Sequence, residues 1–106
     1  MKTMTAPREY TTDECREMFL EHLDFLFAHH MAGHTKKARD AAHMIVFSIL
    51  CTFDGVSGGS PAFDLLTAPH ESDAEYCRSE GDNWYPMGAN IADGSLHESW
   101  INRCKP

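Results

Sequence analysis

The chain has 106 residues, of which 42% are hydrophobic and 24% charged, and its formal net charge is −7. This length fits one domain or half of an obligate dimer, and the composition excludes a disordered chain. The longest uncharged stretch with helical character, residues 41–53, is too short to span a bilayer, and the acidic balance excludes nucleic acid as the expected partner.

Residues 1–10 are predicted to form a loose arm before a single compact domain over residues 11–106. The sequence TTDE at 11–14 has the capping-box pattern, in which Thr11 and Glu14 each accept the other's backbone amide. It predicts a helix from Thr12 to Met31, ended by Gly33. One broad face of this helix is apolar and contains Cys15, Met18, Phe19, Leu20, Leu23, Leu26 and Phe27.

A second helix is predicted to start after Thr35 and to end near Phe53, where Asp54-Gly55 stops it. No charged residue lies between Asp40 and Asp54, so this helix is apolar nearly all round. Such a helix is expected to be covered on most sides. It is therefore predicted to be the central element, packed antiparallel against the first helix.

The second half of the chain is richer in turns. Alternating residues at 63–67 predict one short strand, ended by Pro69. The S-x-x-E pattern occurs at 72–75 and again at 95–98, and it predicts a helix from Asp73 to Glu80 and a last helix. The inner face of that last helix is expected to contain Leu96, Trp100, Ile101 and Cys104. The predicted fold class is mainly α, with α+β as the alternative: an antiparallel helical hairpin core, short C-terminal helices and at most a small strand element.

Several histidines occur where they could do chemistry. His43 lies in the second helix one turn after Asp40, which could hold one ring nitrogen; a structural histidine would have the same neighbours. Together with His70, Asp73 and His97 it would make a zinc or iron site, although the spacing does not require these residues to meet. The alternative is that each is a hydrogen-bonded structural residue. His29, His30 and His34 are interpreted as a solvated helix end, with metal binding as the alternative.

The stretch from 71 to 85 combines acidic and aromatic side chains. Carboxylates rimming large aromatic residues are typical of a binding surface, and an acidic surface favours a basic partner. Of Trp84 and Tyr85, one is expected in the core and the other at the surface. The expected partner-binding residues are Glu71, Asp73, Glu75, Glu80, Asp82, Trp84 and Tyr85.

The four cysteines, at 15, 51, 77 and 104, are far apart and form no C-x-x-C pair. Reduced, mostly buried thiols are expected, rather than disulfides or a four-cysteine zinc site. The N-terminal sequence MKTMTAPREY has no apolar segment typical of a secretion signal, so a cytoplasmic location is expected.

The segment from Ala38 to Trp100 resembles a family of small proteins encoded in bacterial and phage genomes. The resemblance rests on ARDAAH at 38–43, Asp54-Gly55, PAFDLLTAPHESD at 61–73, EGDNWYP at 80–86 and LHESW at 96–100. It implies a bacterial or phage source and an accessory role, and it carries over no activity, cofactor or catalytic residue. The motif members include His43, His70, Glu80, Asn83, Trp84 and His97.

Three functions are compatible with these observations. The favoured one is a non-enzymatic interaction protein without cofactor, such as an immunity or anti-defence inhibitor that binds a basic surface of a protein partner. The second is a small metal-binding protein or metal-dependent enzyme that uses the histidines and Asp73. The third is a homodimeric structural protein whose Phe- and Met-rich first helix pairs with its copy. No membrane partner is expected.

Overall fold

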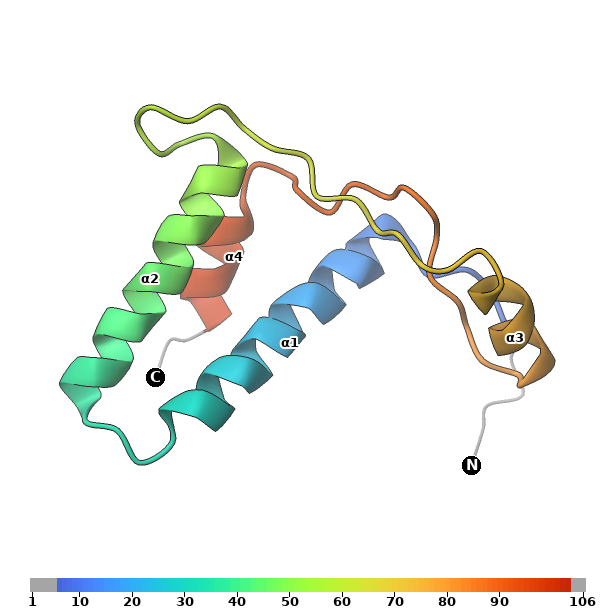
Figure 1. Cartoon of the computed structure of the whole chain (residues 1–106), viewed down its shortest axis with the longest axis horizontal. Helices are drawn as coiled ribbons and strands as arrows, with labels where there is room; N and C mark the ends of the chain where they lie inside the picture. Colours follow the sequence, from blue (N-terminus) through green and yellow to red (C-terminus); the bar gives the residue numbers. More distant parts are fainter. Residues whose placement is uncertain (1–5, 104–106) are drawn as a thin grey trace.

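A computed structural model describes residues 6–103, and within this range the chain is mainly helical, as predicted. α1 and α2 form an open hairpin, α4 packs beside α2, and α3 lies at the opposite end of the molecule (Figure 1). Among the described residues, the only β-pairing consists of isolated bridges. The four helices are α1 (Thr12–Met31), α2 (Lys36–Asp54), α3 (Asp73–Ser79) and α4 (Leu96–Arg103).

The ends of α1 follow the predicted signals. The Thr11 hydroxyl accepts the Glu14 amide at 3.1 Å, and the Glu14 carboxylate accepts the Thr11 amide at 3.0 Å, which confirms the capping box. Arg8 donates to both Glu14 carboxylate oxygens at 2.7 Å and strengthens this end. After Met31 the chain turns through Gly33, whose φ of 82° lies in the left-handed region.

The ends of α2 also confirm the prediction. The Thr35 hydroxyl accepts the Ala38 amide, and Gly55 ends the helix with a φ of 79°. A Cβ atom on Gly55 would lie 2.7 Å from the Cβ of Ala62, so a larger residue there would be both strained and crowded.

The core lies where α4 meets the hairpin. Its fully buried side chains are Leu20 of α1, Leu50 of α2, and Leu96 and Trp100 of α4. The Trp100 indole donates to the His43 carbonyl at 3.3 Å, and its ring packs edge-on against Phe27. The prediction of a helical hairpin is therefore correct. However, α2 makes more extensive contacts with α4 than with α1. Ile101, expected on the inner face of α4, is exposed, and Cys104 lies outside the described residues.

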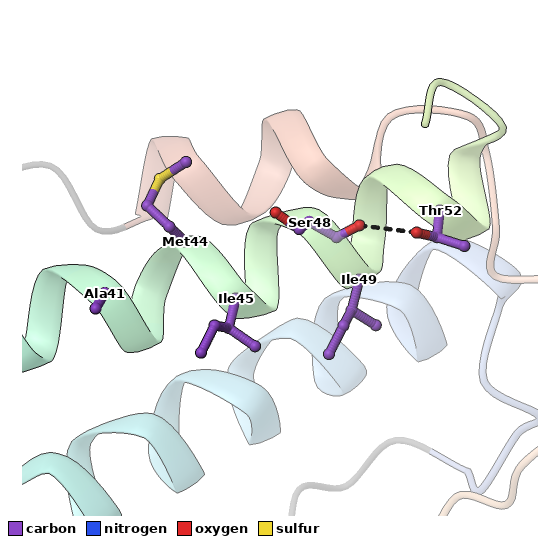
Figure 2. A pocket seen from close by; sticks show the side chains of 6 residues that line it. All are labelled: Ala41, Met44, Ile45, Ser48, Ile49 and Thr52. Atoms are coloured by element: carbon purple, nitrogen blue, oxygen red, sulfur yellow. Dashed lines mark hydrogen bonds between the residues drawn. The ribbon is translucent and has the colours of Figure 1, made fainter. Parts of the chain in front are cut away.

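The face of α2 that points away from the core is open to solvent. Met44, Ile45 and Ile49 project from it and are all exposed (Figure 2). The prediction that α2 is covered on most sides is therefore wrong for the single chain. The absence of charge from 41 to 53 had indicated coverage on most sides, but α1 and α4 leave residues 41, 44, 45, 48 and 49 exposed.

The predicted strand at 63–67 is a single bridge. Leu66 pairs with Asn90, and the Thr67 and Ile91 amides donate to the Ala89 and Leu65 carbonyls. The Asn90 side chain accepts the Leu65 amide. It thus replaces the backbone carbonyl that would accept this amide if the β-ladder continued. At the opposite end of the bridge the Gly88 amide donates to the Thr67 carbonyl at 2.8 Å, and Gly88 has a φ of 75°.

Residues 8–10, placed by the sequence in the N-terminal arm, pair with residues 83–84. The Asn83 side chain accepts the Arg8 amide, and the Tyr10 amide donates to the Trp84 carbonyl at 2.8 Å. This pairing fixes the start of α1 against the chain that follows α3. Residues 1–5 of the arm lie outside the described residues.

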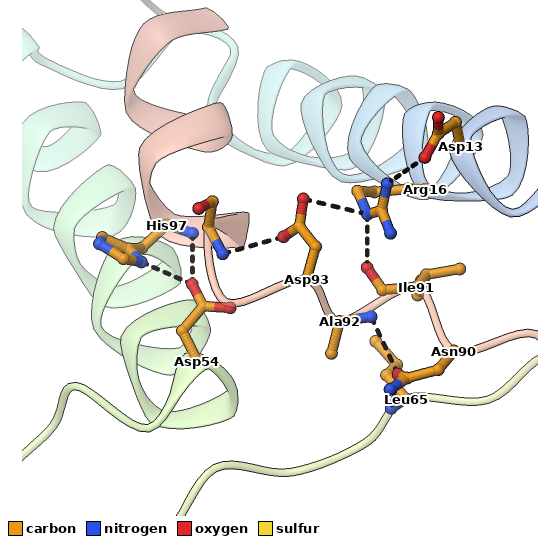
Figure 3. A network of polar contacts seen from close by, with 10 residues as sticks. Asp13, Arg16, Asp54, Leu65, Asn90, Ile91, Ala92, Asp93 and His97 are labelled. Atoms are coloured by element: carbon orange, nitrogen blue, oxygen red, sulfur yellow. Dashed lines mark hydrogen bonds and ion pairs between the residues drawn. The ribbon is translucent and has the colours of Figure 1, made fainter.

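Arg16 connects α1 to the segment that leads into α4. Its guanidinium donates to the Ile91 carbonyl at 2.7 Å and to Asp13 at 2.6 Å, and it lies 3.3 Å from Asp93 (Figure 3). The Asp93 carboxylate in turn accepts the Ser95 amide, just before α4 begins. These contacts set the position from which α4 approaches the hairpin.

Candidate functional site

The residues expected to bind a partner gather around α3. The His70 amide donates to Asp73 at 3.1 Å, and the His70 ring lies 2.8 Å from the Ser72 hydroxyl. Ser72 has helical backbone angles and makes no side-chain capping bond, so the predicted capping box with Glu75 is wrong. The Ser72 hydroxyl is held by the His70 ring instead.

All five expected carboxylates at this end of the molecule are exposed, and an exposed aromatic residue lies among them. Tyr76, in the middle of α3, is 66% exposed, although it is large and mostly apolar. Its neighbour Arg78 is the one basic residue of α3. This surface, which we call the α3 face, consists of Glu71, Asp73, Glu75, Tyr76, Glu80 and Asp82.

The Trp84-Tyr85 corner lies beside the α3 face. Trp84 is half-buried, and the Arg78 guanidinium lies 4.5 Å from the centre of its ring. This is a cation–π contact, which holds the indole and the guanidinium against each other. Tyr85 is 48% exposed. One residue of the pair is thus at the surface, as expected, but Trp84 packs against the arm and Arg78 instead of joining the main core.

A hollow of about 290 Å³ lies between the Pro69–Glu71 segment and the Trp84–Met87 segment. Tyr85 forms part of its wall: its ring centre is 5.0 Å from that of Tyr10, and its hydroxyl lies 3.9 Å from the Met18 sulfur. Burial of the phenol raises the pKa of Tyr85 above its usual 10.0, so the ring is neutral at physiological pH. The carboxylates of Glu9 and Glu71 also line the hollow. Neutral rings beside carboxylates suit the apolar stem and cationic head of a lysine or arginine side chain.

The four residues of the expected metal site do not come together. His70 and Asp73 lie at α3, whereas His43 and His97 lie where α2 meets α4, at the other end of the molecule (Figure 1). Within residues 6–103, no three His, Cys, Asp or Glu side chains are grouped in a way that could hold a metal ion.

His97 instead pairs with Asp54, a residue that the sequence indicated only as a helix end. Asp54 is fully buried and accepts both the His97 ring nitrogen Nδ1, at 2.5 Å, and the His97 backbone amide, at 2.9 Å (Figure 3). The carboxylate at the end of α2 therefore caps the start of α4. A side-chain acceptor 43 residues away was not detectable from local spacing.

His43 is a packed aromatic residue rather than a partner of Asp40. Its ring stacks on Trp100 with centres 4.9 Å apart, and Phe27 meets its edge. Asp40 binds Lys36 at 2.8 Å, which holds the pKa of that carboxyl below its usual range. The buried Nε2 of His43 has no hydrogen-bond partner among the described residues. This environment supports a structural role for His43.

The environments of the other histidines and of the thiols likewise indicate no chemical role for these residues. His29, His30 and His34 are all exposed at the end of α1, as a solvated helix end requires. Cys15, Cys51 and Cys77 are free, as expected, and burial raises the pKa of the Cys15 and Cys51 thiols. A raised pKa disfavours the thiolate, so neither cysteine has the setting of a nucleophile.

No family model, curated protein or solved structure matches this chain. Over residues 6–103, no helix is both long enough and apolar enough to cross a lipid bilayer.

Proposed function

We propose that the chain is a non-enzymatic interaction protein that binds a basic surface of a protein partner through the α3 face and the adjacent hollow. The observation that carries this proposal is the exposure of Tyr76 and Tyr85 among carboxylates. Exposed tyrosines give large contact area at low entropic cost and are enriched among residues that dominate binding energy. Carboxylates around them speed association with a positively charged partner.

The hollow gives this interaction a specific anchor. A lysine or arginine of the partner would place its stem against Trp84, Tyr85 and Met87 and its charge near Glu9 and Glu71. Such a contact discriminates between partners by shape as well as by charge. An inhibitor of the immunity or anti-defence type, covering a basic functional site of its target, would use the surface in this way. A bacterial or phage origin and a cytoplasmic location belong to the same proposal.

The test compares two variants with the same change in net charge. Asp73→Lys combined with Glu75→Lys reverses charge on the α3 face, whereas Glu21→Lys combined with Glu98→Lys reverses it on exposed positions elsewhere. Tagged proteins are used to capture partners from a bacterial lysate, and the captured proteins are quantified by mass spectrometry. We expect partners retained by the wild type and the second variant to be lost from the first.

Tyr76→Ala, which changes no charge, should weaken binding of a partner found in this way by about tenfold or more. His43→Phe should leave that binding unchanged, because His43 belongs to α2, which lies at the opposite end of the molecule from α3. Equal loss of capture in both charge variants would mean that overall charge, and not the α3 face, attracts the proteins. A loss of partner binding in His43→Phe but not in Tyr76→Ala would contradict the proposal.

A further inference from the structure

The outward face of α2 is a surface that the proposed function leaves unused. It consists of Ala41, Met44, Ile45, Ser48, Ile49 and Thr52, which line a shallow groove of about 360 Å³ (Figure 2). Met44, Ile45 and Ile49 are 48%, 62% and 50% exposed. Single exposed apolar residues are common on protein surfaces, but a continuous helix face of this kind is not.

The spacing of this face is that of a helix-packing surface. Ala41, Ile45, Ser48 and Thr52 follow one another at intervals of four, three and four residues, which is the spacing of a coiled-coil seam. Three of these four side chains are small, so another helix can approach closely. Ile45 is the one long apolar side chain within the seam, and Met44 and Ile49 flank it.

The chain exposes more surface than a compact monomer of its mass would. The whole chain exposes 7391 Å². A compact monomer of 11.9 kDa exposes about 5,900 Å². The excess of about 1,400 Å² exceeds the ~800 Å² that each partner loses in an interface of standard size. The radius of gyration, 16.4 Å, is likewise larger than the ~13 Å expected of a compact domain of this length.

The charge distribution allows a second copy as the occupant of this face. Two molecules of net charge −7 repel each other over most of their surfaces, and the α3 face of one would repel that of the other. The outward face of α2 carries no charged residue from 41 to 53, so two copies can meet there without opposing like charges. A face without charged residues can also pair with its own copy across a twofold axis without opposing like charges.

Charge also selects the orientation. Lys36, Lys37 and Arg39 lie at the start of α2, and the end of a helix carries a partial negative charge. Antiparallel pairing places each basic start beside the negative end of the other α2, whereas parallel pairing would bring the two basic clusters together. With the seam centred between Ile45 and Ser48, each Ile45 contacts Ser48 of the other copy.

We propose that the outward face of α2 is the interface of a symmetric dimer in which the α2 helices of two copies pack antiparallel. This interface differs from the dimer considered from the sequence, in which α1 would pair with its copy. It is independent of the α3 face, so either proposal can fail without the other.

Sedimentation equilibrium of the full chain, at concentrations up to about 100 µM, tests the proposal. We expect a mass of twice 11.9 kDa at the highest concentration. Ile45→Glu and Ile49→Glu should each raise the dissociation constant by about 100-fold or more, because each buries a charge in an apolar interface. Leu66→Glu is the matched control: Leu66 is 56% exposed but lies outside α2, and the variant should dimerise like the wild type. Far-ultraviolet circular dichroism verifies that each variant keeps its helix content.

Mixing Ile45→Glu with Ser48→Lys tests the orientation. Each variant alone should be mainly monomeric, and the mixture should form a heterodimer, because antiparallel pairing places the new glutamate beside the new lysine. A wild type that stays monomeric at all concentrations would overturn the proposal. A dimer that persists in folded Ile45→Glu and Ile49→Glu would overturn the assigned face. Two monomeric variants that do not associate on mixing would overturn the antiparallel arrangement.

Discussion

Replacing Asp54 by alanine tests how α4 is held on the hairpin. The change removes two acceptor roles of one buried carboxylate: the cap on the His97 amide and the bond to the His97 ring. Loss of a helix cap costs about 1 kcal/mol. Leaving a buried ring nitrogen without its partner costs about 2 kcal/mol.

One contribution acts in the opposite direction. The second carboxylate oxygen of Asp54, Oδ1, is buried without a hydrogen-bond partner, so its removal recovers about 1 kcal/mol of desolvation free energy. The expected net decrease in the free energy of unfolding is therefore about 2 kcal/mol. That is a large part of the stability of a small domain, which is about 5–10 kcal/mol.

Urea denaturation monitored by circular dichroism measures this decrease. Glu98→Ala is the control, because Glu98 is exposed and its oxygen is 3.7 Å from the other ring nitrogen of His97; we expect a change below about 0.5 kcal/mol. A double-mutant cycle with His97→Ala separates the ring contact from the cap, since the alanine variant keeps its backbone amide. We expect a coupling energy of about 1 kcal/mol or more between Asp54 and the His97 ring. A wild-type-like Asp54→Ala variant, or a coupling energy near zero, would refute the assigned role.

Three other substitutions probe separate parts of the fold. Leu50→Ala should lower the free energy of unfolding by about 2–5 kcal/mol in denaturant titrations, because Leu50 is one of only four fully buried core residues in the described chain. His43→Phe should raise the melting temperature, because it keeps the stack on Trp100 and removes a buried nitrogen that lacks a partner, a gain of about 1 kcal/mol. Glu14 has a pKa lowered to about 2 by its bonds to Arg8 and to the Thr11 amide, so its stabilising contribution is complete above about pH 4.5 and is lost as the pH falls toward 2. The stability difference between wild type and Glu14→Gln should therefore shrink between pH 5 and pH 2 in a series of thermal melts.

Local signals in the sequence were sufficient for the long helices. Thr11 with Glu14, Thr35, and the left-handed Gly55 act within one turn of the residues they affect, so their spacing alone predicts the ends of α1 and α2. The same pattern failed at Ser72, where the neighbouring His70 ring competes for the hydroxyl. A four-residue motif cannot reveal a competitor that lies just outside it.

Contacts between distant segments were not predictable in this way. Asp54 meets His97, and Arg16 meets Ile91, across 43 and 75 residues. The histidines were grouped because they share a chemistry, yet each is satisfied or packed by a different neighbour. The carboxylates and aromatic residues of the α3 face were easier to predict as a group. They lie within fifteen consecutive residues, and so short a segment keeps them close together in space.

The two surfaces proposed here lie at opposite ends of the molecule, with α2 at one end and α3 at the other (Figure 1). A dimer paired through α2 therefore leaves both α3 faces accessible, and each dimer carries two sites for the basic partner. Binding at one site raises the local concentration of the other near any target that displays several copies of the partner, so avidity would exceed the affinity of a single site. Ile45→Glu separates these contributions, because it removes the second site without altering the first. Its affinity for an isolated partner should equal that of the wild type, and only its retention on a densely coated surface should fall.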